Sequence, residues 1–364
     1  MSKLPSIAGI GDVQDICNRI AQHSRGVDRA DEGLLADCYH VDGTVDYRFF
    51  NGPASVFATI LTGAQRGQPV THHRTCQMWV ETNGDEARSE SYVMAYAQSP
   101  EADGASYQRI ICGRYLDRHE RISGQWRLTH RTYVLDTNAN WPGAFDIPTL
   151  PSLATHVPTG GQGAQDAGTA LLAAAKARNG GKMRGQVQMN QEPSTERVAA
   201  IIARQEIANL TMAYCRGVDR ADEELLSSVF HDDSTVVSGV FNGNGQDFAT
   251  EICRIVKTVF DQTFHSIANQ WIEVDGDRAV GETYVVAVST MTDTEDGKSD
   301  MLSGGRYIDR FERRDGVWKI SDRTYVSDWS RVDKTSRQMS EGIYAALDLH
   351  GSRGPEDPVY AFWN

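Results

Sequence analysis

In both halves of the chain, the spacing of apolar residues is first that of helices and then that of strands. The first half opens with apolar positions at helical spacing, such as Ile16 and Ile20, and the second half does so at Ile207 and Leu210. Each opening helix is followed by two shorter predicted helices, and then by three long predicted strands in which apolar and polar residues alternate. Helices followed by antiparallel strands indicate an α+β fold, with the helices packed on one face of a curved sheet.

The two halves are copies of one unit. RGVDRAD occurs at 25–31 and again at 216–222, and GRYLDRHERISGQWRLTHRTYVLD has the counterpart GRYIDRFERRDGVWKISDRTYVSD. The offset of 191 positions (216 − 25) becomes 192 (265 − 73) after the shared FNG. We therefore predict two tandem domains, residues 8–145 and 195–335. A Gly- and Ala-rich linker at 146–194 separates them, and a C-terminal tail at 336–364 has an aromatic end that we expect to dock on the protein.

The overall charge restricts the partners. The chain has 364 residues, 40% of them hydrophobic, and a formal net charge of −13. This acidic balance argues against nucleic acid and against an anionic membrane surface, because both favour a basic face. No apolar run approaches the roughly 20 residues that cross a bilayer, and the N-terminus has no apolar signal core. We expect a cytoplasmic protein.

The known cofactor motifs give no match. The six cysteines form no CxxC pair, which is typical of reduced and mostly buried thiols. The glycines of TGGQGAQDAG follow no predicted strand, so they are not a dinucleotide fingerprint. The chain also lacks Walker A, HExxH and GxSxG sequences. We expect neither a metal nor another cofactor.

Each copy of RGVDRAD offers two carboxylates. Asp31 and Asp222 precede the second helix of each half, where aspartate is a favoured N-cap. One cap per copy is enough, so Asp28 and Asp219, each preceded by an apolar valine, can point inward instead. These two are candidate catalytic residues, and a capping role is the alternative.

A histidine begins a predicted strand in each half, His73 in THHRTCQMWVE and His265 in TFHSIANQWIE. Strict alternation places an amide or another polar residue and a tryptophan on the same face as each histidine. Such a face suits the lining of a ligand pocket better than an apolar core. The candidate substrate-binding residues on these faces are Gln77, Trp79, Asn269 and Trp271.

The duplication bears on the roles of the aspartate and the histidine. Both copies keep both residues, although most surface positions have diverged. A carboxylate that orients an imidazole and stabilises its charged form lets the imidazole abstract a proton. The candidate pairs are Asp28 with His73 and Asp219 with His265. A hydrogen bond that the fold requires would be retained in the same way.

Two further residue types are candidates for the same sites. Tyr214 lies five positions before Asp219 and is either a core residue or an acid that assists a departing oxygen. Its counterpart in the first half, His23, is a candidate substrate-binding residue. Arg131 and Arg323 lie late in the predicted strands, within HRTYV and DRTYV. Each arginine either pairs with an aspartate across the sheet or holds a polar substituent of a substrate.

Taken together, these motifs resemble the SnoaL-like domain of the nuclear transport factor 2-like superfamily. The motifs are RGVDRAD, YHVDGTVD or FHDDSTVV, H-x5-W before GD-x-A, GRY-[LI]-DR-x-ER and W-[RK]-x3-RTYV, and they cover nearly all of 8–140 and 195–332. The resemblance implies a cone-shaped α+β barrel around a deep apolar pocket in each half. The branch that it resembles most includes scytalone dehydratase, bile-acid 7α-dehydratase and hexachlorocyclohexane dehydrochlorinase, and a diarylpropane lyase belongs to the same superfamily.

The resemblance also implies roles for the candidate residues. It makes the two Asp–His pairs the catalytic groups and matches the family's late-strand arginine to Arg131 and Arg323. The tyrosine of the bile-acid enzyme matches Tyr214, whereas the first half has His23 at this position. This difference favours the second half as the active one.

We therefore expect a cofactor-independent lyase of the dehydratase, dehydrohalogenase or formaldehyde-releasing type. Its partner would be a small hydrophobic substrate, aromatic or polycyclic. An isomerase or an epoxide hydrolase on the same scaffold is an alternative, and so is a non-catalytic ligand-binding or assembly module. We expect either a homo-oligomer or an intramolecular pseudo-dimer of the two halves.

Overall fold

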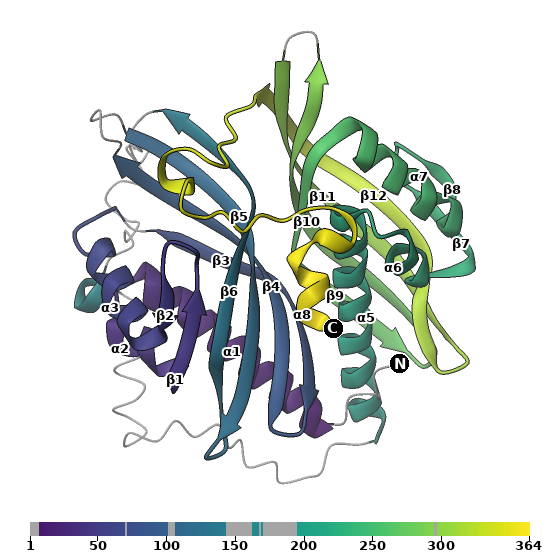
Figure 1. Ribbon diagram of the computed structural model, residues 1–364. Helices are drawn as coiled ribbons and strands as arrows, with labels where there is room; N and C mark the ends of the chain where they lie inside the picture. The colour runs from purple at the N-terminus through teal and green to yellow at the C-terminus, as the bar shows by residue number, and fades with distance from the viewer. Residues whose placement is uncertain are drawn as a thin grey trace, which may run out of the picture.

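Two sheets of six strands, each with its own helices, make up the molecule (Figure 1). The computed structural model describes residues 7–69, 71–100, 106–142, 162–166, 169, 195–294 and 297–364. The strand order is β2-β1-β6-β5-β4-β3 in the first sheet and β8-β7-β12-β11-β10-β9 in the second. The predicted α+β fold is thus confirmed, and it occurs twice with the same topology.

The first repeat begins with its helices, α1 (Ile7–Asp28), α2 (Glu32–Asp37) and, after two short strands, α3 (Ala54–Gln65). Its strands are β1 (Tyr39–Asp46), β2 (Asn51–Pro53), β3 (His72–Asn83), β4 (Glu86–Pro100), β5 (Ser106–Ile122) and β6 (Gln125–Pro142). Neighbouring strands are antiparallel except for β1 and β6, which run parallel.

The second repeat has the same order of elements. Its helices are α5 (Thr195–Arg220), α6 (Glu223–Ser228) and α7 (Gly245–Val259). Its strands are β7 (Phe230–Val237), β8 (Asn242–Asn244), β9 (Phe260–Asp275), β10 (Arg278–Thr294), β11 (Gly297–Arg314) and β12 (Val317–Lys334). The parallel pair is β7 with β12.

Each sheet has four long strands, so the prediction of three was wrong. Tight turns at Gly84 and Gly276, positions where the sequence GD predicts hairpins, separate β3 from β4 and β9 from β10. These glycines have φ values of 64° and 58°, which glycine adopts readily. Two short strands at one sheet edge, β1 with β2 and β7 with β8, were also not predicted.

The positions of RGVDRAD have separate structural tasks at the junction of α1 and α2. A Cβ on Gly26 would lie 3.0 Å from the backbone of Leu35, so glycine permits the close approach of the two helices. Ala30 has a φ of 49°, in the left-handed region that follows helix ends. Asp31 accepts a hydrogen bond from the Leu34 N–H and caps α2, which confirms the predicted capping role. The second copy repeats the left-handed alanine and the cap.

The arginines of the heptad bind a carboxylate from the segment that follows each repeat. Arg29 lies 3.7 Å from Asp166, to which Arg25 also donates at 2.8 Å, and its counterpart Arg220 donates to Asp357 at 2.8 Å. Each aspartate ends a short sequence, GAQD or GPED, in which a single turn of 3-10 helix precedes it. The repeated unit therefore extends beyond the last strand and into the predicted linker, 146–194, most of which lies outside the described residues.

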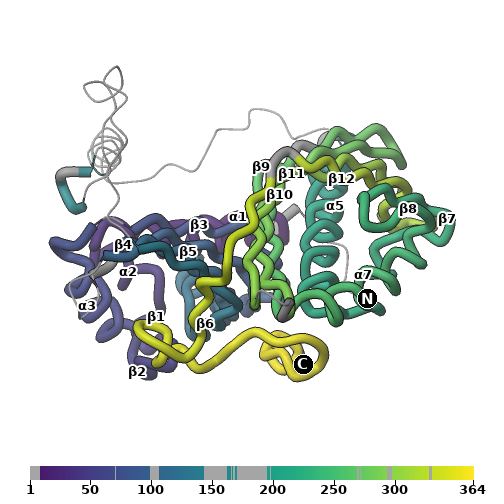
Figure 2. Tube along the Cα trace, turned by 90° about the horizontal axis from the view of Figure 1, so that it is seen from above, coloured from purple at the N-terminus to yellow at the C-terminus, as the bar shows by residue number. Residues whose placement is uncertain are grey.

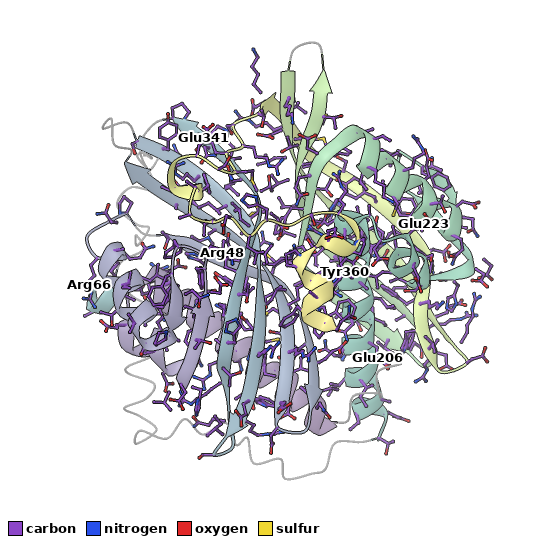
Figure 3. All side chains as sticks on the ribbon, viewed as in Figure 1. Arg48, Arg66, Glu206, Glu223, Glu341 and Tyr360 are labelled. Atoms are coloured by element: carbon purple, nitrogen blue, oxygen red, sulfur yellow. The ribbon has the colours of Figure 1, made fainter. Side chains whose placement is uncertain are left out.

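The C-terminal tail, residues 336–364, connects the two repeats. It leaves β12, passes along β6 of the first repeat and ends beside α5 as α8 (Pro358–Trp363) (Figures 1 and 2). Tyr344 is fully buried in the core of the first repeat. Asp357 lies between two buried guanidinium groups, Arg114 of the first repeat and Arg220 of the second. The Tyr360 hydroxyl donates to the aspartate that caps α6, so the aromatic end docks as predicted (Figure 3).

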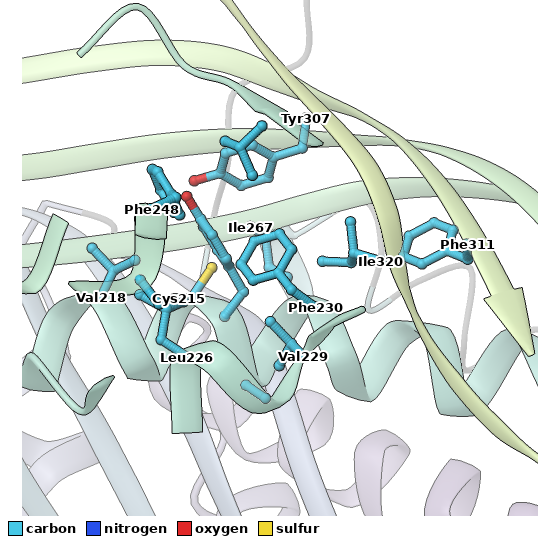
Figure 4. Packing of buried hydrophobic residues seen from close by; sticks show 14 of the residues in the cluster. Cys215, Val218, Leu226, Val229, Phe230, Phe248, Ile267, Tyr307, Phe311 and Ile320 are labelled. Carbon is cyan, nitrogen blue, oxygen red and sulfur yellow. The ribbon is translucent and has the colours of Figure 1, made fainter. Parts of the chain in front are cut away.

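The core of the second repeat lies between its helices and the inner face of its sheet. Phe230, Phe248, Tyr307 and Ile320 come together there from α7 and three strands (Figure 4). The first repeat has an equivalent core around Phe57 and Tyr115. Among the described residues, no helix is long and apolar enough to cross a bilayer.

Candidate active site

An aspartate and a histidine meet in both repeats. In the second repeat His265 Nδ1 lies 2.6 Å from Asp219 Oδ1, and the His265 backbone N–H donates to Asp219 Oδ2 at 2.9 Å. The same two distances join His73 to Asp28 in the first repeat. The aspartate comes from the last turn of the long helix, and the histidine comes from the first part of β3 or β9. The fold thus brings each predicted Asp–His pair together.

In the second repeat a buried, charged aspartate contacts a histidine whose imidazole is partly exposed. Asp219 is fully buried, whereas the His265 side chain is 19% exposed. Burial alone would raise the pKa of Asp219, but the charge and hydrogen bonds of His265 outweigh it, with help from Arg220, and the pKa lies below its ordinary value. An ionised Asp219 favours the proton on His265 Nδ1 and leaves Nε2 as the basic nitrogen.

A cavity of about 330 Å³ opens on His265. The described residues offer no hydrogen-bond partner to His265 Nε2, so this nitrogen is available to a ligand in the cavity. The helices contribute an apolar wall, and the sheet contributes the opposite wall. The residues of the helical wall are Tyr214, Val218, Phe248, Ile252, Ile255 and Val256.

Tyr214 lines the cavity and Arg323 lies behind it. The Arg323 guanidinium stacks on the Tyr214 ring at 4.0 Å and forms two hydrogen bonds to Asp309 at 2.8 and 2.7 Å. Burial raises the pKa of the Tyr214 phenol to about 12, although Arg323 opposes this rise. The phenol is therefore protonated at neutral pH and can donate a hydrogen bond. Arg323 does not line the cavity, so of its two predicted roles the structure has the ion pair across the sheet.

His23 and Arg131 of the first repeat are the counterparts of Tyr214 and Arg323, and their environment is different. His23 is fully buried and its Nε2 lies 3.0 Å from the Tyr39 hydroxyl. Burial holds the pKa of His23 well below its ordinary value, and Arg131 and His73 act in the same direction. Arg131 forms two hydrogen bonds to Asp117, as Arg323 does to its own aspartate. His23 is thus a neutral core residue.

Larger side chains stand in the first repeat where the second has its cavity. Tyr47, Ile111 and Leu135 occupy the positions of three serines of the second repeat. Tyr47 stacks on Tyr133 with ring centroids 5.4 Å apart. The tail adds Tyr344 to the same cluster. Bulkier side chains thus stand at these positions, while the His73 side chain is 18% exposed, close to the 19% of His265.

Strict alternation does not hold along β3, so the predicted placement of Gln77 and Trp79 was wrong. The pairing of β3 with β4 shifts by one residue between Thr75 and Met78, which is a β-bulge. A one-residue shift moves the following side chains to the other face. The Gln77 side chain donates to the His265 carbonyl at 2.7 Å and accepts from the Ile267 N–H at 3.0 Å.

Trp79 likewise lies at the contact between the repeats. Its ring lies 4.0 Å from the Arg216 guanidinium and 6.2 Å from the ring of Trp363 in the tail. Asn269 and Trp271 are in β9, which has a similar bulge opposite Thr283 and Tyr284. Their side chains lie outside the described part of the structure, so their predicted contact with a substrate stays a prediction.

Several cavity residues were not predicted from the sequence. They are mainly hydroxyl-bearing residues on the inner face of the sheet, namely Thr263, Ser289, Ser303, Tyr307, Tyr325, Ser327 and Ser330. The signal that could have found the serines is a difference between the copies, because the first repeat has apolar residues at most of these positions. Among the described residues, no group of three His, Cys, Asp or Glu side chains lies together as a metal-ligand set.

The known proteins most relevant to this site share one domain type. The model of the SnoaL-like domain matches residues 10–132 and 199–324. Hexachlorocyclohexane dehydrochlorinase 1 from Sphingobium indicum is 29% identical over 108 residues, which are 29% of this chain and 68% of that protein. The gamma-hexachlorocyclohexane dehydrochlorinase of the same species is 27% identical over 115 residues, which are 31% of this chain and 72% of that protein.

Solved structures of a dehydrochlorinase and of a putative dehydratase are also similar to this chain. A hexachlorocyclohexane dehydrochlorinase from Novosphingobium barchaimii is 26% identical, with a TM-score of 0.34, and covers 38% of this chain and 92% of that one. A putative scytalone dehydratase from Novosphingobium aromaticivorans is 22% identical, with a TM-score of 0.33, and covers 37% of this chain and 94% of that one.

Proposed function

The chain belongs to the SnoaL-like domain family, and on that premise we propose that its second repeat is a cofactor-independent lyase. His265 is the base, Asp219 orients it, and the cavity takes a hydrophobic small molecule. The observation that carries the proposal is that the partly exposed His265, bound to the buried Asp219, lines a cavity of about 330 Å³ with an apolar wall. Pockets of this size and lining are typical of small-molecule sites.

The proposed reaction is an elimination. His265 Nε2 takes a proton from the carbon next to the one that bears the leaving group. The electron pair of the broken C–H bond forms the new double bond, and the leaving group departs with the electrons of its own bond. Asp219 stabilises the imidazolium that results, as a carboxylate does for a histidine base in other enzymes.

Tyr214 is suited to assist the departure of the leaving group. Its phenol is protonated at neutral pH and can donate a proton to a departing oxygen, which then leaves as water. The Arg323 guanidinium stacked on its ring at 4.0 Å stabilises the phenolate until the imidazolium returns the proton. A departing halide needs no such proton, so Tyr214 favours dehydration over dehydrohalogenation.

The relatives support elimination as the reaction class. Two of them carry the name of dehydrochlorinase, an enzyme that removes a proton and a chloride from adjacent carbons. The first repeat is proposed to be a structural partner, because larger side chains stand there at the positions of three cavity serines of the second repeat. An isomerase on the same scaffold would use the same base without a leaving group.

The test compares two matched substitutions, His265→Gln and His73→Gln, on a substrate found by screening cyclic alcohols and halides. Glutamine keeps a polar side chain and removes the basic nitrogen. We expect His265→Gln to lower kcat by about 10²–10⁴-fold, and His73→Gln to leave it within about twofold. The reverse ranking would assign catalysis to the first repeat. Product mass separates the reaction classes, since elimination lowers it, isomerisation leaves it unchanged and epoxide hydrolysis adds water.

A further inference from the structure

The cavity of the second repeat has two chemically different walls. Apolar side chains of α5 and α7, such as Val218, Phe248 and Ile252, form one wall. The facing wall is the inner surface of the sheet, and hydroxyl groups predominate there. Four serines of three neighbouring strands contribute them: Ser289, Ser303, Ser327 and Ser330.

The sheet register fixes where these hydroxyls lie relative to the base. His265 pairs with Ala287, Ala287 pairs with Ser303, and Ser303 pairs with Ser330, so all four form one row across the sheet. Neighbouring strands lie about 4.8 Å apart. The backbone of Ser303 is therefore roughly 10 Å from that of His265, and that of Ser330 roughly 14 Å.

Hydroxyls of this wall have no hydrogen-bond partner in the part of the chain that the structure describes. Among the described residues, none of the four serine side chains has a hydrogen bond; Ser289 is 3% exposed and Ser303 is half-buried, whereas Ser327 and Ser330 are exposed to solvent. Thr263, which pairs with Ser289 across β9 and β10, is 2% exposed, and its hydroxyl has no partner in the described structure. Buried hydroxyls without partners cost free energy unless a ligand or water satisfies them.

The fold itself does not require this wall. The first repeat has Ala97, Ile111 and Leu135 at the positions of Ser289, Ser303 and Ser327. In the first repeat Thr71, the counterpart of Thr263, donates instead to Asp28. The same sheet thus folds with apolar residues at three of the four positions and Asn138 at the fourth, so the serines of the second repeat need another explanation.

We infer that the substrate is a cyclic molecule with hydroxyl or carbonyl oxygens along the edge remote from the carbon that His265 deprotonates. Its other face is hydrocarbon and lies on Phe248 and Ile252. The cavity could hold about eleven waters at ~30 Å³ each, which corresponds to a two-ring molecule of at least that many non-hydrogen atoms. A polychlorinated ring would leave the hydroxyls unpaired. The orientation of this molecule rests on the proposed function, but the preference for oxygen does not.

Binding can test this preference without turnover. The full-length His265→Gln protein is titrated by calorimetry with four probes of similar size: tetralin, tetralone, dihydroxytetralin and hexachlorocyclohexane. We expect the two oxygenated probes to bind about tenfold or more tightly than the other two. In the added double substitution Ser289→Ala with Ser303→Ala, this gap should shrink to about twofold, while the control Ser228→Ala on the surface of α6 should keep it.

The outcomes separate this inference from the proposed lyase activity. Equal affinities, tighter binding of tetralin or the chlorinated ring, no binding by any probe, or a gap that survives the double substitution would overturn the inference. Tighter binding of the oxygenated probes by a protein that catalyses no elimination would support the inference and reject the lyase.

Discussion

The two repeats have the same Asp–His geometry but different surroundings. In each, the histidine Nδ1 lies 2.6 Å from a buried aspartate. In the second repeat the imidazole opens on a cavity, whereas Tyr47 and Leu135 of the first repeat stand where the second has serines. The retained pair alone therefore does not tell the two repeats apart. The space beside it and the polarity of the facing wall distinguish the repeats.

The first repeat has taken on other tasks. It binds the tail through Tyr344, and its Gln77 holds the backbone of β9 on either side of Ser266. It also has two buried histidines, His23 and His119, where the second repeat has a tyrosine and a phenylalanine. The Asp28–His73 pair connects the end of α1 to β3, a contact that accounts for its retention in a repeat that we propose to be structural.

The largest expected effect is a difference in kcat between substitutions of the two aspartates. Asp219→Asn should lower kcat by about 10³–10⁴-fold, because the amide no longer fixes the tautomer or stabilises the imidazolium of His265. Asp28→Asn should leave kcat within about twofold and act on stability alone. Steady-state kinetics with thermal unfolding of both variants checks this. A similar loss of kcat in the two variants would contradict the division of roles.

A smaller effect is expected when the second cavity is filled as the first is. Ser238→Tyr introduces the residue that the first repeat has as Tyr47, beside Tyr325, the counterpart of the Tyr133 on which Tyr47 stacks. We expect kcat/KM to fall about 100-fold while Tm does not fall, because the new ring packs against existing aromatic side chains. The reverse change, Tyr47→Ser, should lower Tm and leave kcat unchanged. Full activity of Ser238→Tyr would show that substrate binds elsewhere.

The repeats should also differ in their response to acid. Burial lowers the pKa of His119 from 6.5 to about 4, so below pH 6.5 the unfolded chain binds a proton that the folded chain does not. Stability therefore falls as the pH drops, by about 2 kcal/mol between pH 7 and pH 5 from this group. His119→Phe, with Ser89→Ala to remove its hydrogen-bond partner, should lose this part of the pH dependence in urea unfolding. An unchanged pH dependence would mean that His119 takes up a proton in the folded state.

The smallest effect concerns the contact between the repeats. Gln77→Leu leaves the His265 carbonyl and the Ile267 N–H without their partner, and we expect a loss of about 1–3 kcal/mol in the free energy of unfolding. The exposed Gln125→Leu serves as the control, with a change within about 0.5 kcal/mol. Equal stability of the two variants would show that the repeats do not depend on this amide.

Much of the fold could be predicted because the repeat supplied two versions of each pattern. The α+β order and the Asp–His pairs followed from residues that both copies keep. The bulge in β3 could not be predicted, since a single inserted residue leaves the run of apolar and polar residues nearly unchanged and yet reverses the faces of Gln77 and Trp79.

The cavity was missed for a different reason. Ser303 looks like an ordinary solvent-facing position in a strand, and only the pairing of the sheet places it in one row with His265. The sequence indicates on which strand Arg323 lies, but it does not indicate where its guanidinium points. The prediction that this group could reach a substrate therefore could not be checked before the structure. The partner of Arg323, Asp309, lies on the neighbouring strand, directly opposite in the register.

The burial of Tyr344 in the first repeat has a consequence for how the protein is made. About 200 residues separate Pro142, the end of β6, from this tyrosine. At ribosomal speeds of about 5–20 residues per second, the half that emerges first waits roughly 10–40 s for the side chain that completes its interior. The nascent first repeat must therefore remain unfinished, and in need of protection from aggregation, until translation has nearly ended.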